Sequence, residues 1–275
     1  MTAPASGAVL LIGAGRMGGA LIKGWIAAKR FSAIHVVEPS ASEALKGLAG
    51  TGAIAIHERF DGGSLPPLAA IVLAVKPQVL KGEAALLSAL GKTGALVLSI
   101  AAGINTGFLG THLGPKARLV RAMANTPGAI GQGISVLYAA RGLSAGDRAL
   151  AELLMQSLGE TLWLDDETLM DAVTAVSGSG PAYVFLMAEA LAEAGRAQGL
   201  DAVTADRLAR ATVSGAGALL AADSREAAAL RKEVTSPGGT TEAALNVLMA
   251  PGGLPNLMNR AIAAATLRGK QLGKG

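Results

Sequence analysis

The segment 236–241 combines hydroxyl side chains, a proline and two glycines directly before an amphipathic helix predicted over residues 240–249. The first N–H groups of a helix have no partner within the helix, and the helix N-terminus carries a partial positive charge. Glycine lets a ligand approach the backbone closely. The pattern therefore predicts a binding site for a small carboxylate, formed by Ser236, Pro237, Gly238, Gly239, Thr240 and Thr241. A Ser/Thr-capped helix after a glycine turn, with no ligand, would have the same local sequence.

A second pattern lies near the N-terminus, where Gly13, Gly15 and Gly18 follow the apolar run 8–12 and precede a helical pattern at 20–26. Glycines at this spacing between a strand and a helix are typical of a dinucleotide site. The next apolar run ends at Glu38, twenty positions after Gly18. A dinucleotide fold places there the acid that bonds the ribose hydroxyls. The alternative is a glycine turn that only packs a helix on a strand.

Three further strand ends carry residues that suit a nicotinamide ring and its ribose. The strand predicted at 71–75 runs into Lys76 and Pro77, the next ends around Ala101, and a third leads to Asn125. In a doubly wound sheet the ligand lies at the carboxyl ends of the strands. We therefore expect all three strand ends to face the dinucleotide, although a proline that merely starts the next helix is also consistent with Lys76–Pro77.

The composition excludes several classes of function. The 275 residues include no cysteine, so disulfides, thiolate metal sites and thiol catalysis are impossible. The three histidines show no metal-ligand spacing, so we expect no metal. Basic residues are scattered and aromatic residues make up 3%, which argues against nucleic acid. Residues 1–7 lack the basic region of a signal peptide, and no uninterrupted apolar run is long enough to span a membrane, so a soluble, cytoplasmic protein is expected.

The pattern of elements changes near residue 164. Short apolar runs alternate with helical segments up to this point, which predicts an α/β domain with a parallel, doubly wound sheet over residues 1–164. Only helical periods follow, so residues 165–275 are predicted to be all-α, with helices at 165–177, 181–198, 202–222, 225–234, 240–249 and 254–272. These helices are apolar on more than one face. We therefore expect an obligate dimer or a larger assembly, the alternative being a bundle packed only on its own N-terminal domain.

Four segments together resemble the pyrroline-5-carboxylate reductases, which catalyse the last step of proline synthesis. The segments are 13–18, 74–78, 177–183 and 234–241. The first is shared by many dehydrogenases, whereas the last two, in this order and spacing, are far more specific. The resemblance spans nearly the whole chain. It implies a Rossmann-type domain, a helical dimerisation domain in the style of 6-phosphogluconate dehydrogenase, and dimers that often assemble into a decameric ring.

The resemblance also implies the chemistry. Hydride would pass from NADH or NADPH to the C=N carbon of pyrroline-5-carboxylate, a cyclic imino acid, with the segment 236–241 holding the carboxylate. Thr241 is assigned to hydrogen bonding of the imine nitrogen, because the second half contains no His or Cys that could act as a strong acid. The candidate cofactor contacts are Ile12, Gly13, Ala14, Gly15, Arg16, Met17, Gly18, Glu38, Ser40, Ala74, Val75, Lys76, Pro77, Ala101 and Asn125.

Two residues depart from what the family commonly shows. Ala124 stands where the family usually has proline, which loosens the turn before Asn125. Glu38 would repel the 2′-phosphate of NADPH and favours NADH, whereas Ser40 and Arg59 could assist a phosphate, so use of both cofactors stays open.

Two other functions compete with this interpretation. One is a dehydrogenase of the hydroxyacid or 6-phosphogluconate type. Such enzymes commonly use a helix lysine, and no lysine occurs between Asp165 and Arg231. The other is a non-catalytic sensor that binds a dinucleotide, which only a turnover measurement can distinguish from an enzyme.

Overall fold

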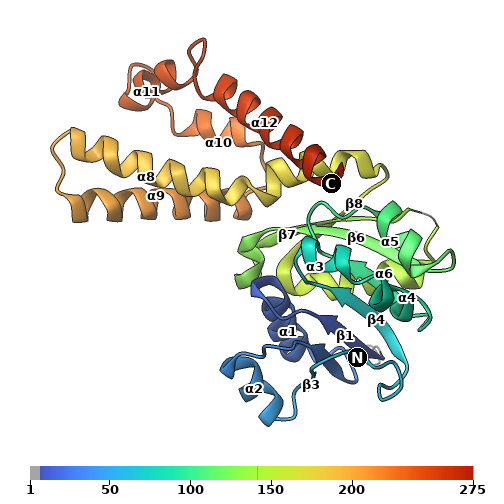
Figure 1. The fold of residues 1–275 in the computed structure, drawn as a ribbon. Helices are drawn as coiled ribbons and strands as arrows, with labels where there is room; N and C mark the ends of the chain where they lie inside the picture. Colours follow the sequence, from blue (N-terminus) through green and yellow to red (C-terminus); the bar gives the residue numbers. More distant parts are fainter. Residues whose placement is uncertain (1–6, 141, 275) are drawn as a thin grey trace. The chain divides into compact units, whose positions relative to one another are not determined.

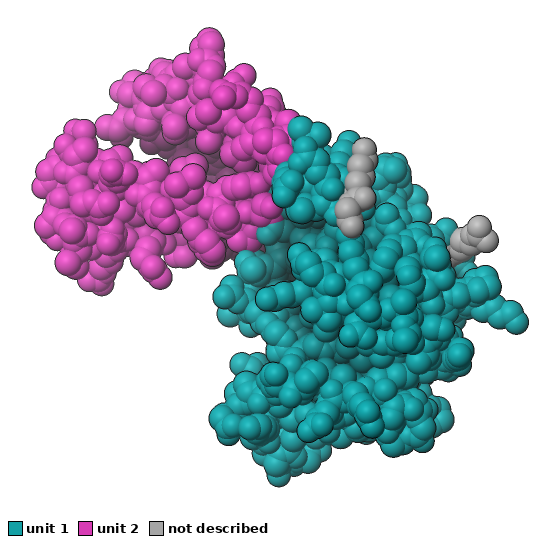
Figure 2. Space-filling model, in the orientation of Figure 1, with its two compact units in different colours: residues 1–178, 266–275 teal, residues 179–265 magenta. Residues whose placement is uncertain are grey.

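The computed structural model describes residues 7–140 and 142–274 and divides them into two compact units. The first unit contains residues up to 178 together with those from 266 onward, and the second contains residues 179–265 (Figure 2). The predicted boundary at 164/165 lies at the end of the last strand, whereas the compact units divide after residue 178. Residues 1–6, on which the expectation about a signal peptide rests, lie outside the described part of the chain.

The first unit is built on an eight-stranded sheet with the strand order β3-β2-β1-β4-β5-β6-β7-β8 (Figure 1). The strands are β1 (Ala8–Ile12), β2 (Ile34–Val37), β3 (Ala55–His57), β4 (Leu68–Leu73), β5 (Leu96–Ser99), β6 (Arg118–Ala124), β7 (Gly133–Tyr138) and β8 (Gly159–Leu164). The strand order reverses at β1: the chain adds β2 and β3 on one side of it, and then β4 and the later strands on the other side. Such a point is where a doubly wound sheet binds ligands.

Helices cover both faces of this sheet. They are α1 (Arg16–Ala28), α2 (Glu43–Gly50), α3 (Pro77–Gly82), α4 (Ala84–Gly91), α5 (Thr106–Leu113) and α6 (Ala145–Met155). Alternate residues of β1 enter different cores: Val9 and Leu11 pack with α1, α2 and α6, whereas Leu10 and Ile12 pack with α3, α4 and α5. Every residue of β1 is buried, as expected for a central parallel strand with both faces covered.

The sheet departs from the prediction in two places. β7 runs antiparallel to β6, so the sheet is mostly rather than wholly parallel. The cause is the connection: residues 125–132 form only a short 3₁₀ turn, and a parallel return needs a crossover of a dozen or more residues. In addition, β3 was not predicted as a strand, because it has only three residues and none of them is buried.

The segment after β8 is also less regular than predicted. Instead of one helix over 165–177, it forms a 3₁₀ turn (Glu167–Leu169), the short helix α7 (Met170–Val173) and a π-helical turn (Thr174–Gly178). Tertiary contacts override the helical periodicity here. Glu167 is held by Arg121 and Thr106, and Ser177 accepts a hydrogen bond from Asn125.

The second unit contains only helices, as predicted. They are α8 (Gly180–Ala197), α9 (Ala202–Ala222), α10 (Ala227–Glu233), α11 (Thr240–Leu248) and α12 (Leu254–Lys274), whose last turns belong to the first unit. α8 and α9 lie side by side as an antiparallel pair (Figure 1). No helix among the described residues is both long and apolar enough to cross a membrane.

Candidate active site

The three glycines between β1 and α1 are each explained by the local geometry. Gly13 has φ +93°, and a Cβ there would meet the Val75 side chain at 2.7 Å and the Ala74 carbonyl oxygen at 3.0 Å. Gly18 is buried, and a Cβ there would lie 2.4 Å from the Gly13 carbonyl oxygen. Gly15 faces open space instead. Two glycines thus pack the turn tightly, and the third leaves room for a ligand to reach the backbone.

The N-terminus of α1 fits a dinucleotide pyrophosphate. Gly15 is the N-cap residue and supplies no side-chain cap, so no side chain of the loop covers the first N–H groups of the helix. Arg16 is exposed beside them and Met17 is half-buried. Unpartnered N–H groups at a helix N-terminus favour an anion. The assignment of the pyrophosphate to this helix end stays a prediction.

The ends of neighbouring strands form a continuous edge next to this loop. Gly13 N donates to the Val37 carbonyl at 2.9 Å, and Ala74 N donates to the Ile12 carbonyl at 2.8 Å. Ile100 N continues the row with a bond of 3.0 Å to the Leu73 carbonyl. Most of the predicted cofactor contacts therefore belong to one edge of one unit.

Individual residues along this edge differ in exposure. Lys76 is exposed as the N-cap of α3, and Pro77 occupies its first turn. Ser40 is exposed after β2. Ile12 and Ala101 are buried in the core, where they can shape the floor of a site but offer little surface to a ligand.

Glu38 accepts two backbone hydrogen bonds. Its Oε2 accepts from Ala14 N at 2.8 Å, and its Oε1 accepts from Ser40 N at 3.2 Å. The carboxylate therefore spans the space between the glycine loop and the loop that follows β2. The sequence predicted the place of this acid but not its bond to the glycine loop.

Asn125 is occupied by contacts within the protein. Its Nδ2 donates to Ser177 Oγ at 3.2 Å, and its Oδ1 accepts from Ile134 N at 3.1 Å. Gly178, next to Ser177, packs so closely that a Cβ there would lie 2.3 Å from the Met123 methyl group. Asn125 thus fixes the π-helical turn that leads to α8. Ser177 was assigned only to a structural segment, and no local signal indicates a partner 52 residues away.

The predicted carboxylate site lies in the second unit. Gly238 adopts φ +71°, and Gly239 is the N-cap of α11 without a side-chain cap. Gly239 N donates to the Ser236 carbonyl at 3.0 Å, which closes the turn, and Gly238 N donates to Glu242 Oε2 at 2.8 Å. The contact with Glu242 was not predicted. A backbone conformation with positive φ suits glycine, which accounts for the residue type at 238.

These bonds decide which groups of the loop remain for a ligand. The N–H groups of Gly238 and Gly239 are already used, and Pro237 has none. The N–H groups of Thr240 and Thr241 begin α11, where no earlier helical carbonyl exists to accept them. Within the described chain, the hydroxyls of Ser236 and Thr241 make no hydrogen bond. The same holds for the hydroxyl of Thr240, so these two amides and the three hydroxyls remain.

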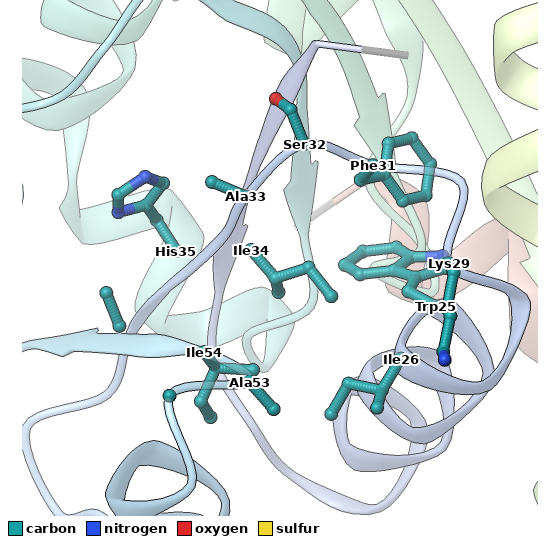
Figure 3. Close-up of a pocket in the computed structure, with 12 residues that line it drawn as sticks. Trp25, Ile26, Lys29, Phe31, Ser32, Ala33, Ile34, His35, Ala53 and Ile54 are labelled. Atoms are coloured by element: carbon teal, nitrogen blue, oxygen red, sulfur yellow. The ribbon is translucent and has the colours of Figure 1, made fainter. Parts of the chain in front are cut away.

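A cavity of about 350 Å³ lies elsewhere, at the amino-terminal ends of β2 and β3 (Figure 3). Apolar side chains line it, including those of Trp25, Ile34 and Ile54, while the ring of His35 points away from them. Ligands of doubly wound sheets bind at the opposite, carboxyl ends of the strands. We therefore do not assign the cavity to the active site. Within residues 7–140 and 142–274, no group of three or more His, Asp or Glu side chains is placed to hold a metal ion.

Comparison with known proteins decides the family. The chain is 42% identical to the pyrroline-5-carboxylate reductase of Pseudomonas aeruginosa over 96% of both chains, and 37% identical to that of Haemophilus influenzae over 87% of this chain and 88% of the relative. This chain belongs to the pyrroline-5-carboxylate reductase family. Residues 167–272 match the family's dimerisation domain, and residues 8–103 match the family model described as NADP oxidoreductase coenzyme F420-dependent.

Solved structures agree with this assignment. A pyrroline-5-carboxylate reductase from Coxiella burnetii superposes with a TM-score of 0.88 at 36% identity, covering 97% of this chain and 98% of the other. The Plasmodium falciparum pyrroline carboxylate reductase, solved with NADP bound, gives 0.79 at 26% identity, covering 98% and 100%. The predicted Rossmann-type domain and helical dimerisation domain are thus confirmed, and the chain is an oxidoreductase that uses NAD(P)H and self-associates.

Proposed function

We propose that this chain reduces 1-pyrroline-5-carboxylate to L-proline with NAD(P)H, the last step of proline biosynthesis. Family membership supports the reaction, and the turn before α11 supports it most directly among the structural observations. That turn presents free amides and free hydroxyls at a positive helix end, as a small carboxylate requires. Its neighbour Glu242 stabilises the turn through Gly238 N, so the site is formed before a ligand arrives.

The proposed substrate site assigns a separate task to each group. The N–H groups of Thr240 and Thr241 and the hydroxyl of Ser236 hold the carboxylate. Pro237, Gly238 and Gly239 shape the turn and leave the approach open. Bonding at several points fixes the orientation of a small ring, and orientation lowers the barrier to hydride transfer.

The hydroxyl of Thr241 completes the chemistry. The bound nicotinamide supplies a hydride to the carbon of the C=N bond. The nitrogen needs a proton, and an imine can take it up before the hydride arrives, so a hydroxyl that hydrogen-bonds this nitrogen is sufficient. Thr241 is half-buried and its hydroxyl makes no other bond among the described residues. It is therefore the residue we assign to this role.

The cofactor is proposed to bind along the edge formed by the glycine loop and the ends of β2, β4, β5 and β6. Residues 1–164 then form the dinucleotide-binding domain, and residues 165–275 the domain for dimerisation and substrate binding. The exposed apolar residues of the helical unit support a dimer, and the family resemblance supports its further assembly into a decamer in the cytoplasm. Nucleic acid and membranes have no part in the proposed function.

A turnover assay tests the function. The purified chain is mixed with pyrroline-5-carboxylate and either NADH or NADPH, and both the oxidation of the nicotinamide and the formation of L-proline are followed. We expect one proline for each reduced nicotinamide consumed with at least one of the cofactors. Binding of both cofactors without proline formation would favour the non-catalytic sensor instead.

A further inference from the structure

Glu38 is fixed at the point where the adenosine ribose is expected. It follows β2 directly, and its own N–H donates to the His57 carbonyl of β3 at 3.0 Å, which anchors the backbone. Its two carboxylate oxygens accept from Ala14 N and Ser40 N. With the backbone and both oxygens held, the side chain cannot swing away without breaking two hydrogen bonds to N–H groups.

The charge of Glu38 is not neutralised by a neighbouring cation. Among residues 7–140 and 142–274, no ion pair involves Glu38, and its two side-chain partners are both backbone amides. Each oxygen of a carboxylate has a further lone pair, so Glu38 can still accept bonds from the 2′- and 3′-hydroxyls of a ribose. A phosphate on the 2′ oxygen would instead bring close to two negative charges beside this carboxylate and offer it no donor.

We propose that Glu38 makes this chain select NADH over NADPH, by accepting hydrogen bonds from the adenosine ribose and repelling a 2′-phosphate. The inference rests on the proposed cofactor site and goes beyond the use of NAD(P)H that the family comparison shows. The fold itself accepts a 2′-phosphate, because the Plasmodium falciparum relative was solved with NADP. Selection between NADH and NADPH therefore has to come from side chains. In this chain, Glu38 is the acid held where the adenosine ribose is expected.

Direct binding measurements test the proposal without any turnover. Dissociation constants for NADH and NADPH are measured by calorimetry on the full chain, in the absence of pyrroline-5-carboxylate. We expect NADH to bind at least about tenfold more tightly, since the repulsion acts close to the protein surface. Added salt should reduce the ratio between the two constants, because it screens repulsion between charges. Equal or tighter binding of NADPH by the unmodified chain would overturn the proposal.

The variant Glu38→Gln separates charge from shape. Glutamine keeps one oxygen to accept from Ala14 N but carries no charge. We expect NADPH to bind at least about fivefold more tightly than it does to the unmodified chain, with NADH binding weakened or unchanged. Glu160→Gln, on the far edge strand β8, removes the same charge from an exposed position and should leave the ratio unchanged.

Two results would contradict the role of Glu38. One is an equal change of both dissociation constants in Glu38→Gln, and the other is the same change in Glu160→Gln. Circular dichroism of both variants checks that they fold. Because these constants are measured without substrate, a chain that selects NADH but forms no proline would defeat the proposed function and support this inference.

Discussion

At the scale of single residues, the proposed site combines side chains that are hydrogen-bonded within the protein with hydroxyls that are available to a ligand. Glu38 and Asn125 are satisfied within the protein, whereas the hydroxyls of Ser236 and Thr241 make no bond among the described residues. Motif spacing in the sequence placed Glu38 at the end of a strand and Thr241 at the start of a helix, as the structure has them, while their roles stay predictions. It could not predict the partners of Asn125, because these come from segments that meet only in the folded chain.

Thr241 gives the first prediction. Thr241→Ala should lower kcat for pyrroline-5-carboxylate by about a hundredfold with a small change in KM, because the backbone N–H that holds the carboxylate remains. Thr241→Ser keeps a hydroxyl and should retain most of the activity. Thr240→Ala is the matched control at the neighbouring exposed position, and steady-state kinetics on all three variants makes the comparison. An unchanged kcat in Thr241→Ala would remove this side chain from the mechanism.

His35 gives a prediction about pH. Its Nδ1 lies 3.1 Å from His57 Nε2, and its Nε2 is buried without a partner in the described chain. Burial, followed by the charge of His57, lowers the pKa of His35 below its usual 6.5. As pH falls below that value, the unfolded chain binds a proton more readily than the folded one, so the free energy of unfolding decreases. Above pH 6.5, the neutral form of His35 predominates in the folded and the unfolded chain, so the free energy of unfolding is not reduced.

Urea unfolding as a function of pH measures this effect. Between about pH 8 and about pH 5, His35→Gln should lose less stability than the unmodified protein. His112→Gln is the matched control and should follow the unmodified curve, because His112 contacts Phe108 within α5, through the carbonyl and the ring, and has no contact with His35 or His57 among the described residues. Parallel curves for His35→Gln and the unmodified protein would show that His35 does not account for the pH dependence.

At the scale of elements, the local signals predicted type and order well and long-range connections poorly. Glycine, proline and polar breaks fixed the ends of α8 to α12 to within about two residues, the usual uncertainty of helix ends. β3 escaped prediction because three partly exposed residues give no alternation to detect. The antiparallel direction of β7 depends on how short its connection is, and the sequence pattern of a strand does not reveal its direction.

Glu167 joins three elements and yields a prediction about stability. It accepts from Arg121 at 3.0 Å and from the backbone and hydroxyl of Thr106, which connects the segment after β8 to β6 and to the start of α5. The side chain of Arg121 is only 8% exposed. Glu167→Gln should destabilise the protein by about 3–5 kcal/mol, because it leaves a buried charge without its partner.

The control for Glu167 is an exposed ion pair of the same unit. Glu43 contacts Lys46 at 2.8 Å on the surface of α2, and Glu43→Gln should cost less than about 1 kcal/mol. Chemical denaturation of both variants gives the comparison. Similar losses in the two variants would mean that the contact of Glu167 with Arg121 contributes no more than a surface pair.

At the scale of the whole molecule, self-association follows from what the helical unit fails to bury. Among its described residues, the buried apolar side chains are only Ala192, Ala205 and Ala209. Large apolar side chains remain exposed instead: Val184, Phe185, Leu186, Met187, Leu191, Leu208, Leu219, Leu220, Val247, Leu248, Met249 and Leu257. Patches of this kind mark protein interfaces. The predicted need for a partner came from helices that are apolar on more than one face, and the matched dimerisation domain confirms self-association.

The central claim concerns the whole molecule, because the proposal assigns the substrate to a turn in one compact unit and the cofactor to the other unit. The KM for pyrroline-5-carboxylate in Gly239→Val tests it most directly. A Cβ at this position lies 3.0 Å from the Ser236 carbonyl oxygen, and the valine methyl groups would occupy the approach to the free amides. The account predicts that KM rises at least about tenfold, equivalent to about 1.4 kcal/mol, while the dissociation constant for NADH stays unchanged. An unchanged KM in a folded Gly239→Val variant would contradict the account.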